Sequence, residues 1–267
     1  MLAVARRYGS LLRTELKISG ALALQYRMDF VFNGVKALFW LGITLLPLRA
    51  VFAHRAQVEG WSWPEALVVL GWFSLLKAIL EGSVSPSLTA VVEGVRTGAL
   101  DFVLLKPADA QFLVSTARFE PWRAVDGVGA LAIIAYAFVQ LGRWPRPGHV
   151  LVALVLLLVA VLLLYSLWIL VVSASFWVVR VDNLSYLFGS LFDVGRWPIN
   201  VFKGALRVIF TVVFPLALMT TFPAQALLGK DLPLWKAGLA VLGGVTFAAF
   251  ARAVWKRAIG FYTSASS

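Results

Sequence analysis

Six apolar segments alternate with short polar connections along this chain. An α-helix rises about 1.5 Å per residue, so about 20 residues can cross the hydrocarbon core of a membrane, which is about 30 Å thick. The apolar segments cover residues 28–50, 63–84, 123–141, 149–178, 205–226 and 235–254. The pattern predicts an all-α membrane protein with six transmembrane helices, in one transmembrane domain over residues 1–267. Because the fourth segment is longer than the bilayer requires, we expect it to tilt or to project beyond the membrane.

Residues 1–25 have the pattern of an amphipathic helix. Arg6, Arg13 and Lys17 fall on one helical face, and Tyr8 and Leu11 fall on the other. Such a helix binds at the lipid headgroups, so we expect residues 1–25 to lie on the inner face of the membrane. The alternative is a mobile basic tail. These residues have no compact apolar core, so they do not have the pattern of a cleavable signal peptide.

Composition and charge agree with a membrane protein. The chain is 61% hydrophobic and 14% charged, whereas soluble domains have about 25% charged residues. Sixteen lysines and arginines lie on the side of both termini if the termini are cytoplasmic, against six on the other side. This excess predicts cytoplasmic termini and explains the net charge of +11 without nucleic acid as a partner. The second cytoplasmic loop contributes Arg180, Arg196, Lys203 and Arg207 to the count.

Catalytic and metal-binding motifs are absent from the sequence. The chain has no cysteine and only two histidines, and these do not form a metal-binding motif. It contains neither a nucleophile turn of the form G-x-S-x-G nor a phosphate-binding loop of the form G-x-x-x-x-G-K-[ST]. We therefore expect no enzyme activity and no cofactor in this chain. Lys77 and Glu81 are four residues apart, which is the spacing of a structural ion pair on a helix.

A short amphipathic helix is predicted in the loop between the second and third spans. Ser85 and Pro86 are typical of a helix start, and Gly98 is typical of a helix end. Glu93 and Arg96 lie away from the apolar stripe, which consists of Leu88, Val91, Val92 and Val95. A short apolar run then extends from Leu100 past Asp101 to residue 105, where Lys106 and Pro107 interrupt it. The pattern fits a simple surface link and a docking element for a cytoplasmic partner equally well.

Two later segments each allow two interpretations. Leu184, Leu187, Phe188, Leu191 and Phe192 recur at helical spacing after Asp182, which predicts a second helix in the cytoplasmic loop. Its apolar face favours an interfacial helix over a contact with a partner protein. In the fifth span, Pro215 and Pro223 each remove a backbone donor, so we expect the helix to kink or break there.

A polar stripe follows one face of the first span. Asp29, Asn33, Lys36, Trp40 and Thr44 recur at intervals of three or four residues. A charged side chain that faces hydrocarbon near mid-depth costs at least about 2.5 kcal/mol. We therefore expect this stripe to face the translocation path or a dimer interface. The alternative is that Lys36 alone extends its ammonium group toward the headgroups.

The segment 93–114, EGVRTGALDFVLLKPADAQFLV, resembles the cytoplasmic loop of ABC-2 family permeases, and in particular their drug- and viologen-exporting branch. The similarity lies in Gly98, in Leu100-Asp101, in Leu104-Leu105-Lys106-Pro107 and in Phe112-Leu113. The resemblance extends at lower specificity over the whole chain. It implies a permease subunit of the bacterial plasma membrane, in which the helix that begins at residue 85 couples to an ATPase. It also implies a re-entrant segment near the outer face, around Pro215, Phe222 and Pro223.

In such an exporter, two permeases pair and dock on a cytoplasmic ATPase dimer that binds ATP and Mg²⁺. The second permease is either an identical or a homologous subunit, and the substrate is an amphipathic small molecule or drug. The alternatives are an ATP-independent channel, a secondary transporter and an integral-membrane enzyme. Channels and secondary transporters usually need intramembrane acids or internal repeats, which the sequence shows weakly or not at all.

Overall fold

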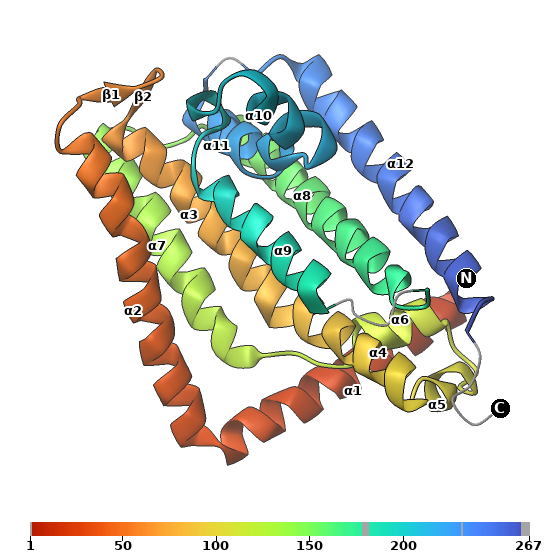
Figure 1. The fold of residues 1–267 in the computed structure, drawn as a ribbon. Helices are drawn as coiled ribbons and strands as arrows, with labels where there is room; N and C mark the ends of the chain where they lie inside the picture. The colour runs from red at the N-terminus through yellow and green to blue at the C-terminus, as the bar shows by residue number, and fades with distance from the viewer. Residues whose placement is uncertain (1, 178–181, 231, 263–267) are drawn as a thin grey trace.

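The structure is a computed structural model that describes residues 2–177, 182–230 and 232–262, and it is a bundle of helices (Figure 1). Within these residues, five helices are long and apolar enough to cross a membrane. They are α2 (Arg27–Phe52), the continuous helix Trp63–Thr97 that begins with α3 (Trp63–Ile79), the helix Pro121–Leu141 that contains α7 (Ala124–Leu141), α8 (Pro147–Ala174) and α12 (Leu234–Ile259). Their length and apolar character agree with the predicted all-α membrane protein, but within the described residues they are five and not the six that the sequence predicts.

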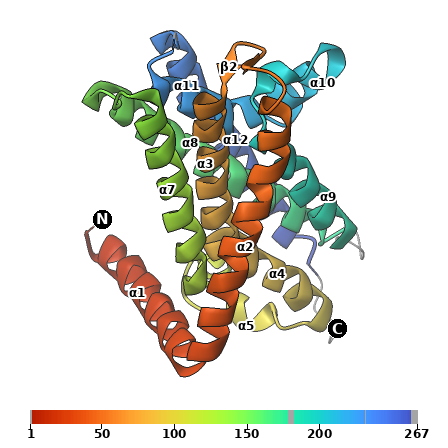
Figure 2. The ribbon, with the colours of Figure 1, turned by 90° about the vertical axis from the view of Figure 1, so that its left-hand side faces the viewer.

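The bundle has two distinct ends. A hairpin of β1 (Gln57–Val58) and β2 (Trp61–Ser62) marks one of them, which we call the hairpin end. At the opposite end lie α1 (Leu2–Gln25), α4 (Ser85–Thr97), α5 (Asp101–Leu104) and α6 (Ala110–Ser115), and we call it the α4 end (Figure 2). The helix predicted over residues 1–25 is confirmed as α1.

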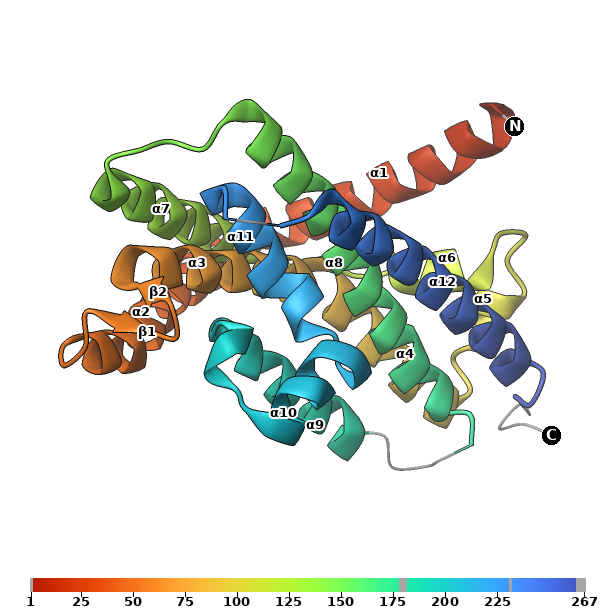
Figure 3. The same cartoon turned by 90° about the horizontal axis from the view of Figure 1, so that it is seen from above.

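The core of the bundle is formed by α3 and α8. Both lie in the middle when the bundle is viewed along its length, with α2 and α7 on one side and α12 on the other (Figure 3). Leu67, Leu76 and Leu156 are fully buried, whereas large side chains of α2, such as Phe32 and Phe39, are mostly exposed. Exposed apolar faces on outer helices are what a membrane protein presents to lipid or to another subunit. The fourth predicted segment ends at residue 178, which, like Arg180, lies outside the described residues.

The structure differs from the sequence-based expectation between residues 182 and 230. The helix α9 (Asp182–Asp193) packs along α3 and α8, with Phe192 against Phe73 and Phe188 against Trp168. Its aromatic face is therefore covered by the bundle and not by lipid headgroups. Two 3-10 turns, Val194–Arg196 and Ile199–Val201, follow α9. The chain thus returns toward the hairpin end through α9 (Figure 1).

Residues 205–226 do not form one spanning helix, and the break that the sequence predicts at Pro215 is present. They are divided among α10 (Gly204–Val208), two π-turns (Ile209–Val213 and Ala217–Thr221) and α11 (Phe222–Leu228), with a break at Pro215. The Lys203 ammonium lies 3.0 Å from the Glu59 carboxylate, and Lys230 lies 2.9 Å from Glu65. Both ends of this segment are therefore at the hairpin end. Lys203 and Arg207 therefore do not lie at the same end of the bundle as α1 and α4, although the charge count placed them on the side of the termini.

Candidate functional site

The predicted helix after the second span is present as α4, but Ser85 is not the cap of a new helix. A π-turn, Leu80–Val84, connects α3 to α4 without a break, and Ser85 itself has helical backbone angles. A π-turn widens the helix locally and often marks a functional site. Gly98 ends α4 with a φ of 76°, as predicted, because glycine adopts this left-handed conformation without steric cost.

The apolar stripe of α4 holds the helix against its own chain. Leu88 and Val91 are buried, while Val92 and Val95 are half-buried against the core. These four side chains anchor α4, so Leu88 and Val91 are covered before any partner arrives. Glu93 and Arg96 lie away from this stripe and form an exposed ion pair of 2.8 Å. A pair of this kind contributes about 0.2–1 kcal/mol to stability.

The tip of the loop exposes two large apolar side chains, Phe102 and Leu105, of which the sequence analysis named only Leu105. Leu100 is buried, and Asp101 is half-buried at the start of α5. Phe102 and Leu105, however, are 72% and 82% exposed. Lys106 and Pro107 end the segment, and both are also exposed. An apolar pair beside a base at the end of a helical bundle is typical of a protein-binding surface.

A polar network behind this tip connects α6 to the last span. Asp109 caps α6 by accepting a hydrogen bond of 3.0 Å from the Phe112 backbone N–H. The Arg252 guanidinium of α12 binds the Asp109 carboxylate and donates a hydrogen bond of 2.6 Å to the side-chain amide oxygen of Gln111. Gln111 in turn donates to the Tyr165 hydroxyl of α8 at 2.9 Å. The network therefore connects the loop to α8 and α12 at the α4 end.

The first helix contacts the same network. The Tyr8 hydroxyl accepts a 3.0 Å hydrogen bond from the Asp109 backbone N–H, and its ring packs edge-on against Phe112 at 4.7 Å. Arg7 donates to the Pro107 carbonyl oxygen. The spacing of Asp109 and Phe112 resembles a helix cap and could have been found in the sequence. Its partner Arg252 could not, because the two residues are 143 positions apart.

We expect the Asp109–Arg252 pair to stabilise the protein only above about pH 4. The hydrogen bond from Arg252 lowers the pKa of Asp109, and the bond from the Phe112 N–H acts in the same direction. Because the pKa is lower in the folded state, the stabilisation is complete above the ordinary aspartate pKa of about 4 and is lost as the pH falls through the folded-state value. The detergent-solubilised Asp109→Asn variant should melt about 2–4 °C below the native protein at pH 7, because a partly exposed pair contributes about 1 kcal/mol.

The difference in melting temperature should shrink toward zero below about pH 4. Glu93→Gln is the matched control, because Glu93 also pairs with an arginine but is 57% exposed at its side chain. A difference between Asp109→Asn and the native protein that stays constant down to low pH would contradict this assignment.

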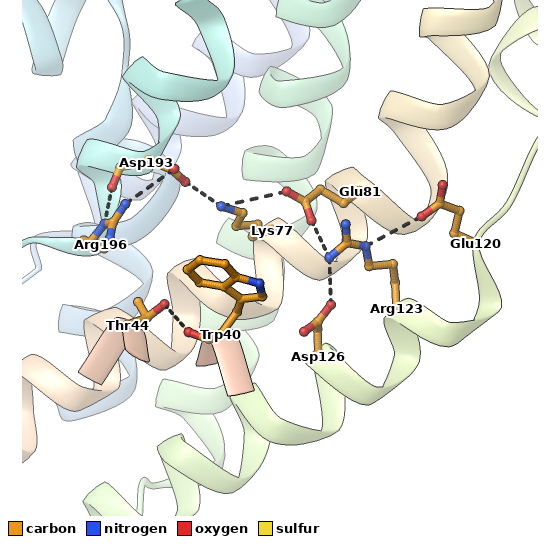
Figure 4. A network of polar contacts seen from close by, with 9 residues as sticks. All are labelled: Trp40, Thr44, Lys77, Glu81, Glu120, Arg123, Asp126, Asp193 and Arg196. Carbon is orange, nitrogen blue, oxygen red and sulfur yellow. Dashed lines mark hydrogen bonds and ion pairs between the residues drawn. The ribbon is translucent and has the colours of Figure 1, made fainter. Parts of the chain in front are cut away.

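A chain of charged side chains lies deeper in the bundle, between α3, α7 and the end of α9 (Figure 4). The Lys77 ammonium lies 2.7 Å from the Asp193 carboxylate and 3.8 Å from Glu81. Glu81 also binds the Arg123 guanidinium at 2.6 Å, and Arg123 binds Asp126 at 3.0 Å. The predicted Lys77–Glu81 pair is thus one link of a larger network. Such a network is tolerated inside a membrane only where it faces protein or a water-filled space.

The network borders a cavity of about 470 Å³ between α2, α3 and α7. Three members of the polar stripe on α2 line this cavity, namely Lys36, Trp40 and Thr44. Lys36 also lies over the Trp122 ring, 5.9 Å from its centre. Asn33 and Asp29 are not among the lining residues, and the Asn33 amide donates to the Asp29 backbone carbonyl oxygen within α2. The structure therefore brings three of the five stripe residues to the charged network.

The other predicted segment, around Pro215, lies at the hairpin end. Pro215 is half-buried at the break, and Phe222 begins α11. The buried Pro223 occupies the first turn of that helix, where its missing N–H removes no intrahelical hydrogen bond. In the described residues no group of three or more acidic or histidine side chains lies close enough to hold a metal ion. The site consists of the loop tip, the polar network behind it and the charged cavity above it.

Comparison with known proteins gives one match. The model of the ABC-2 family transporter protein matches residues 38–266, which is most of the chain. No curated protein and no solved structure matches the chain. The long apolar helices and this match establish a multi-pass membrane protein that is a transmembrane subunit and not a catalytic enzyme. The chain belongs to the ABC-2 family of transporter proteins.

Proposed function

We propose that this chain is the permease subunit of an ATP-driven exporter. The observation that carries the proposal is the exposed apolar pair Phe102 and Leu105 on a loop whose helix α4 is anchored in the bundle. The chain has no phosphate-binding loop of its own, so a separate cytoplasmic ATPase dimer would bind ATP and Mg²⁺. The partner-facing residues of α4 and the loop tip would be Glu93, Arg96, Phe102, Leu105 and Lys106.

The family match and the arrangement of the helices support a paired permease in the bacterial plasma membrane. In this proposal the α4 end and both termini are cytoplasmic, and α9 with its 3-10 turns supplies the fifth of six crossings. The segment 204–228 would then enter and leave the membrane from the outer side, because Lys203 and Lys230 both pair with residues at the hairpin end. The basic residues still favour the α4 end as the cytoplasmic side.

The second permease would be an identical or a homologous chain. We place the polar stripe of α2 on the translocation path or at the contact with that second subunit, because Lys36, Trp40 and Thr44 border the charged cavity. A substrate with both charged and apolar parts suits this cavity, because Phe73 and Pro47 line it together with Lys77 and Asp126. This supports an amphipathic small molecule or drug as the exported compound, as in the drug- and viologen-exporting branch.

A proton- or ion-driven secondary transporter is the second candidate function. The observation that favours it is the presence of Glu81, Asp126 and Asp193 within the bundle, because intramembrane acids often carry coupling ions. A secondary transporter would export its substrate on a proton or ion gradient alone, without any ATPase subunit.

The purified chain is expected to hydrolyse no ATP and to form a stable complex with a separate cytoplasmic ATPase. The physical reason is that this chain supplies the docking surface while its partner supplies the phosphate-binding loop. The measurement is co-expression with one tagged subunit, followed by gel filtration and an ATPase assay with and without the chain. Substrate export by the chain alone in liposomes, driven by a proton gradient, would instead support the secondary transporter.

A further inference from the structure

Two cavities approach each other inside the chain. The first is the charged cavity of about 470 Å³ between α2, α3 and α7. The second, of about 1040 Å³, lies at the α4 end between α1, α4 and residues 117–123. Glu81, Trp122 and Arg123 line both cavities. These three side chains therefore form the wall between a space inside the bundle and a space at its α4 end.

The wall is held together by an ion pair and an aromatic contact. The Glu81 carboxylate lies 2.6 Å from the Arg123 guanidinium, and the side chains are 29% and 25% exposed. Arg123 in turn lies over the Trp122 ring, 4.0 Å from its centre. Figure 4 shows Glu81 reaching from the turn after α3 toward Arg123, which directly precedes α7. We propose that Glu81, Arg123 and Trp122 are a gate that separates the two cavities, and this inference rests on the proposed transport function.

The gate is connected directly to the loop that would meet the ATPase. Glu81 belongs to the π-turn Leu80–Val84, and α4 continues from that turn without a break. The next residue, Gly82, accepts a 2.9 Å hydrogen bond at its carbonyl oxygen from the Glu120 N–H. A Cβ atom at Gly82 would lie only 3.2 Å from the Arg123 Cβ atom, so the two backbones are close together. A displacement of α4 would therefore act directly on the turn that carries Glu81 and on the segment that carries Arg123.

Breaking the Glu81–Arg123 contact leaves neither charge without a partner. Arg123 keeps its 3.0 Å contact with Asp126, and Glu81 keeps Lys77 at 3.8 Å. Removing a charge from its last partner inside a bundle would be strongly unfavourable, but here an alternative partner is already in place. The arrangement of the acids thus allows the Glu81–Arg123 pair to break and re-form, as a gate requires.

The gate can be tested by thiol labelling, because the chain contains no cysteine. Thr44 lines the inner cavity and not the outer one, so Thr44→Cys reports access to the inner cavity. The purified protein is reconstituted in liposomes, and a membrane-impermeant maleimide is added from the α4 side. In the Thr44→Cys protein, we expect slow labelling. Adding Glu81→Gln, which removes the ion pair without changing the size of the side chain, should raise the labelling rate about tenfold.

Trp122→Leu is the second test variant, because it opens the wall while every ion pair remains in place. Glu59→Gln is the matched control, since it also removes one acid from an ion pair, the 3.0 Å pair with Lys203, but lines neither cavity, and its labelling rate should stay unchanged. Unchanged labelling in either folded test variant would overturn the gate, and Trp122→Leu decides the question if Glu81→Gln does not fold. The assay uses the chain without an ATPase, so its failure is separate from a failure of the proposed complex.

Discussion

The double variant Phe102→Asp and Leu105→Asp is expected to lose its ATPase subunit while remaining abundant in the membrane. Both side chains are highly exposed in the isolated chain, so acids at these positions cost little folding free energy. In a complex they would bring two charges into an apolar contact, where a buried unpaired charge is strongly unfavourable. Apolar anchors at the centre of an interface typically contribute 2 kcal/mol or more each, so the affinity should fall by at least about 100-fold.

The measurement is the fraction of ATPase that co-elutes with the variant at matched membrane abundance. Trp144→Asp is the control, because Trp144 is also a large exposed apolar residue, 67% exposed, but lies in the connection between α7 and α8. The control should retain the ATPase. Equal retention of the ATPase by the double variant would show that Phe102 and Leu105 face lipid headgroups and not a partner.

Most of the membrane helices could be predicted from the sequence because their signal is local. A run of about 20 apolar residues specifies a spanning helix without reference to the rest of the chain. The starts of α2, α3 and α12 therefore lie within one residue of the predicted positions. The apolar stripe of α4 and its end at Gly98 were found for the same reason, since helical periodicity and glycine at a helix end are properties of neighbouring residues.

In the region after α8, the helix that follows Asp182 and the break at Pro215 could be predicted, but their positions in the bundle could not, because these depend on distant contacts. A run of apolar residues that contains Pro215 and Pro223 predicts a kinked transmembrane helix. In the structure, the residues at its two ends form ion pairs with Glu59 and Glu65, so both ends lie at the hairpin end of the bundle. The helix α9 reads as interfacial because its apolar face is short, but that face fits against Phe73 and Trp168. Hydropathy alone does not distinguish a face covered by lipid from one covered by protein.

The charged network could be predicted only in part, because most of its ion pairs join residues that are distant in the sequence. Lys77 and Glu81 are close in sequence, and their spacing predicts a pair. The partner of Lys77 on α9, Asp193, is 116 residues away, and Arg123 comes from another span. The stripe on α2 was found from its period, but nothing in that period indicates that Lys36 would meet Trp122. That the stripe faces a translocation path stays a prediction.

Replacing Arg123 with leucine is expected to destabilise the protein far more than the same substitution at Arg96. Arg123 lies within 4 Å of three acids, Glu81, Glu120 and Asp126, and only a quarter of its side chain is exposed. Removing one partner of a buried ion pair costs about 3–5 kcal/mol, and partial solvation in the cavity places the expected loss near 3 kcal/mol. Arg96 also pairs with a glutamate, but its side chain is 69% exposed, so Arg96→Leu should cost less than about 1 kcal/mol.

The free energies of unfolding can be compared in mixed detergent micelles, with circular dichroism as the measure of helix content. Arg123→Leu combined with Glu81→Gln should recover part of the lost stability, because one of the acids left without its base is then neutral. Asp126 and Glu120 remain charged in that double variant, so the recovery should be incomplete. If Arg123→Leu and Arg96→Leu are equally stable, water in the cavity solvates the acids as well as Arg123 does. The charged network would then contribute little to holding α3 against α7, and its Glu81–Arg123 link would be held only by the backbone contact between Gly82 and Glu120.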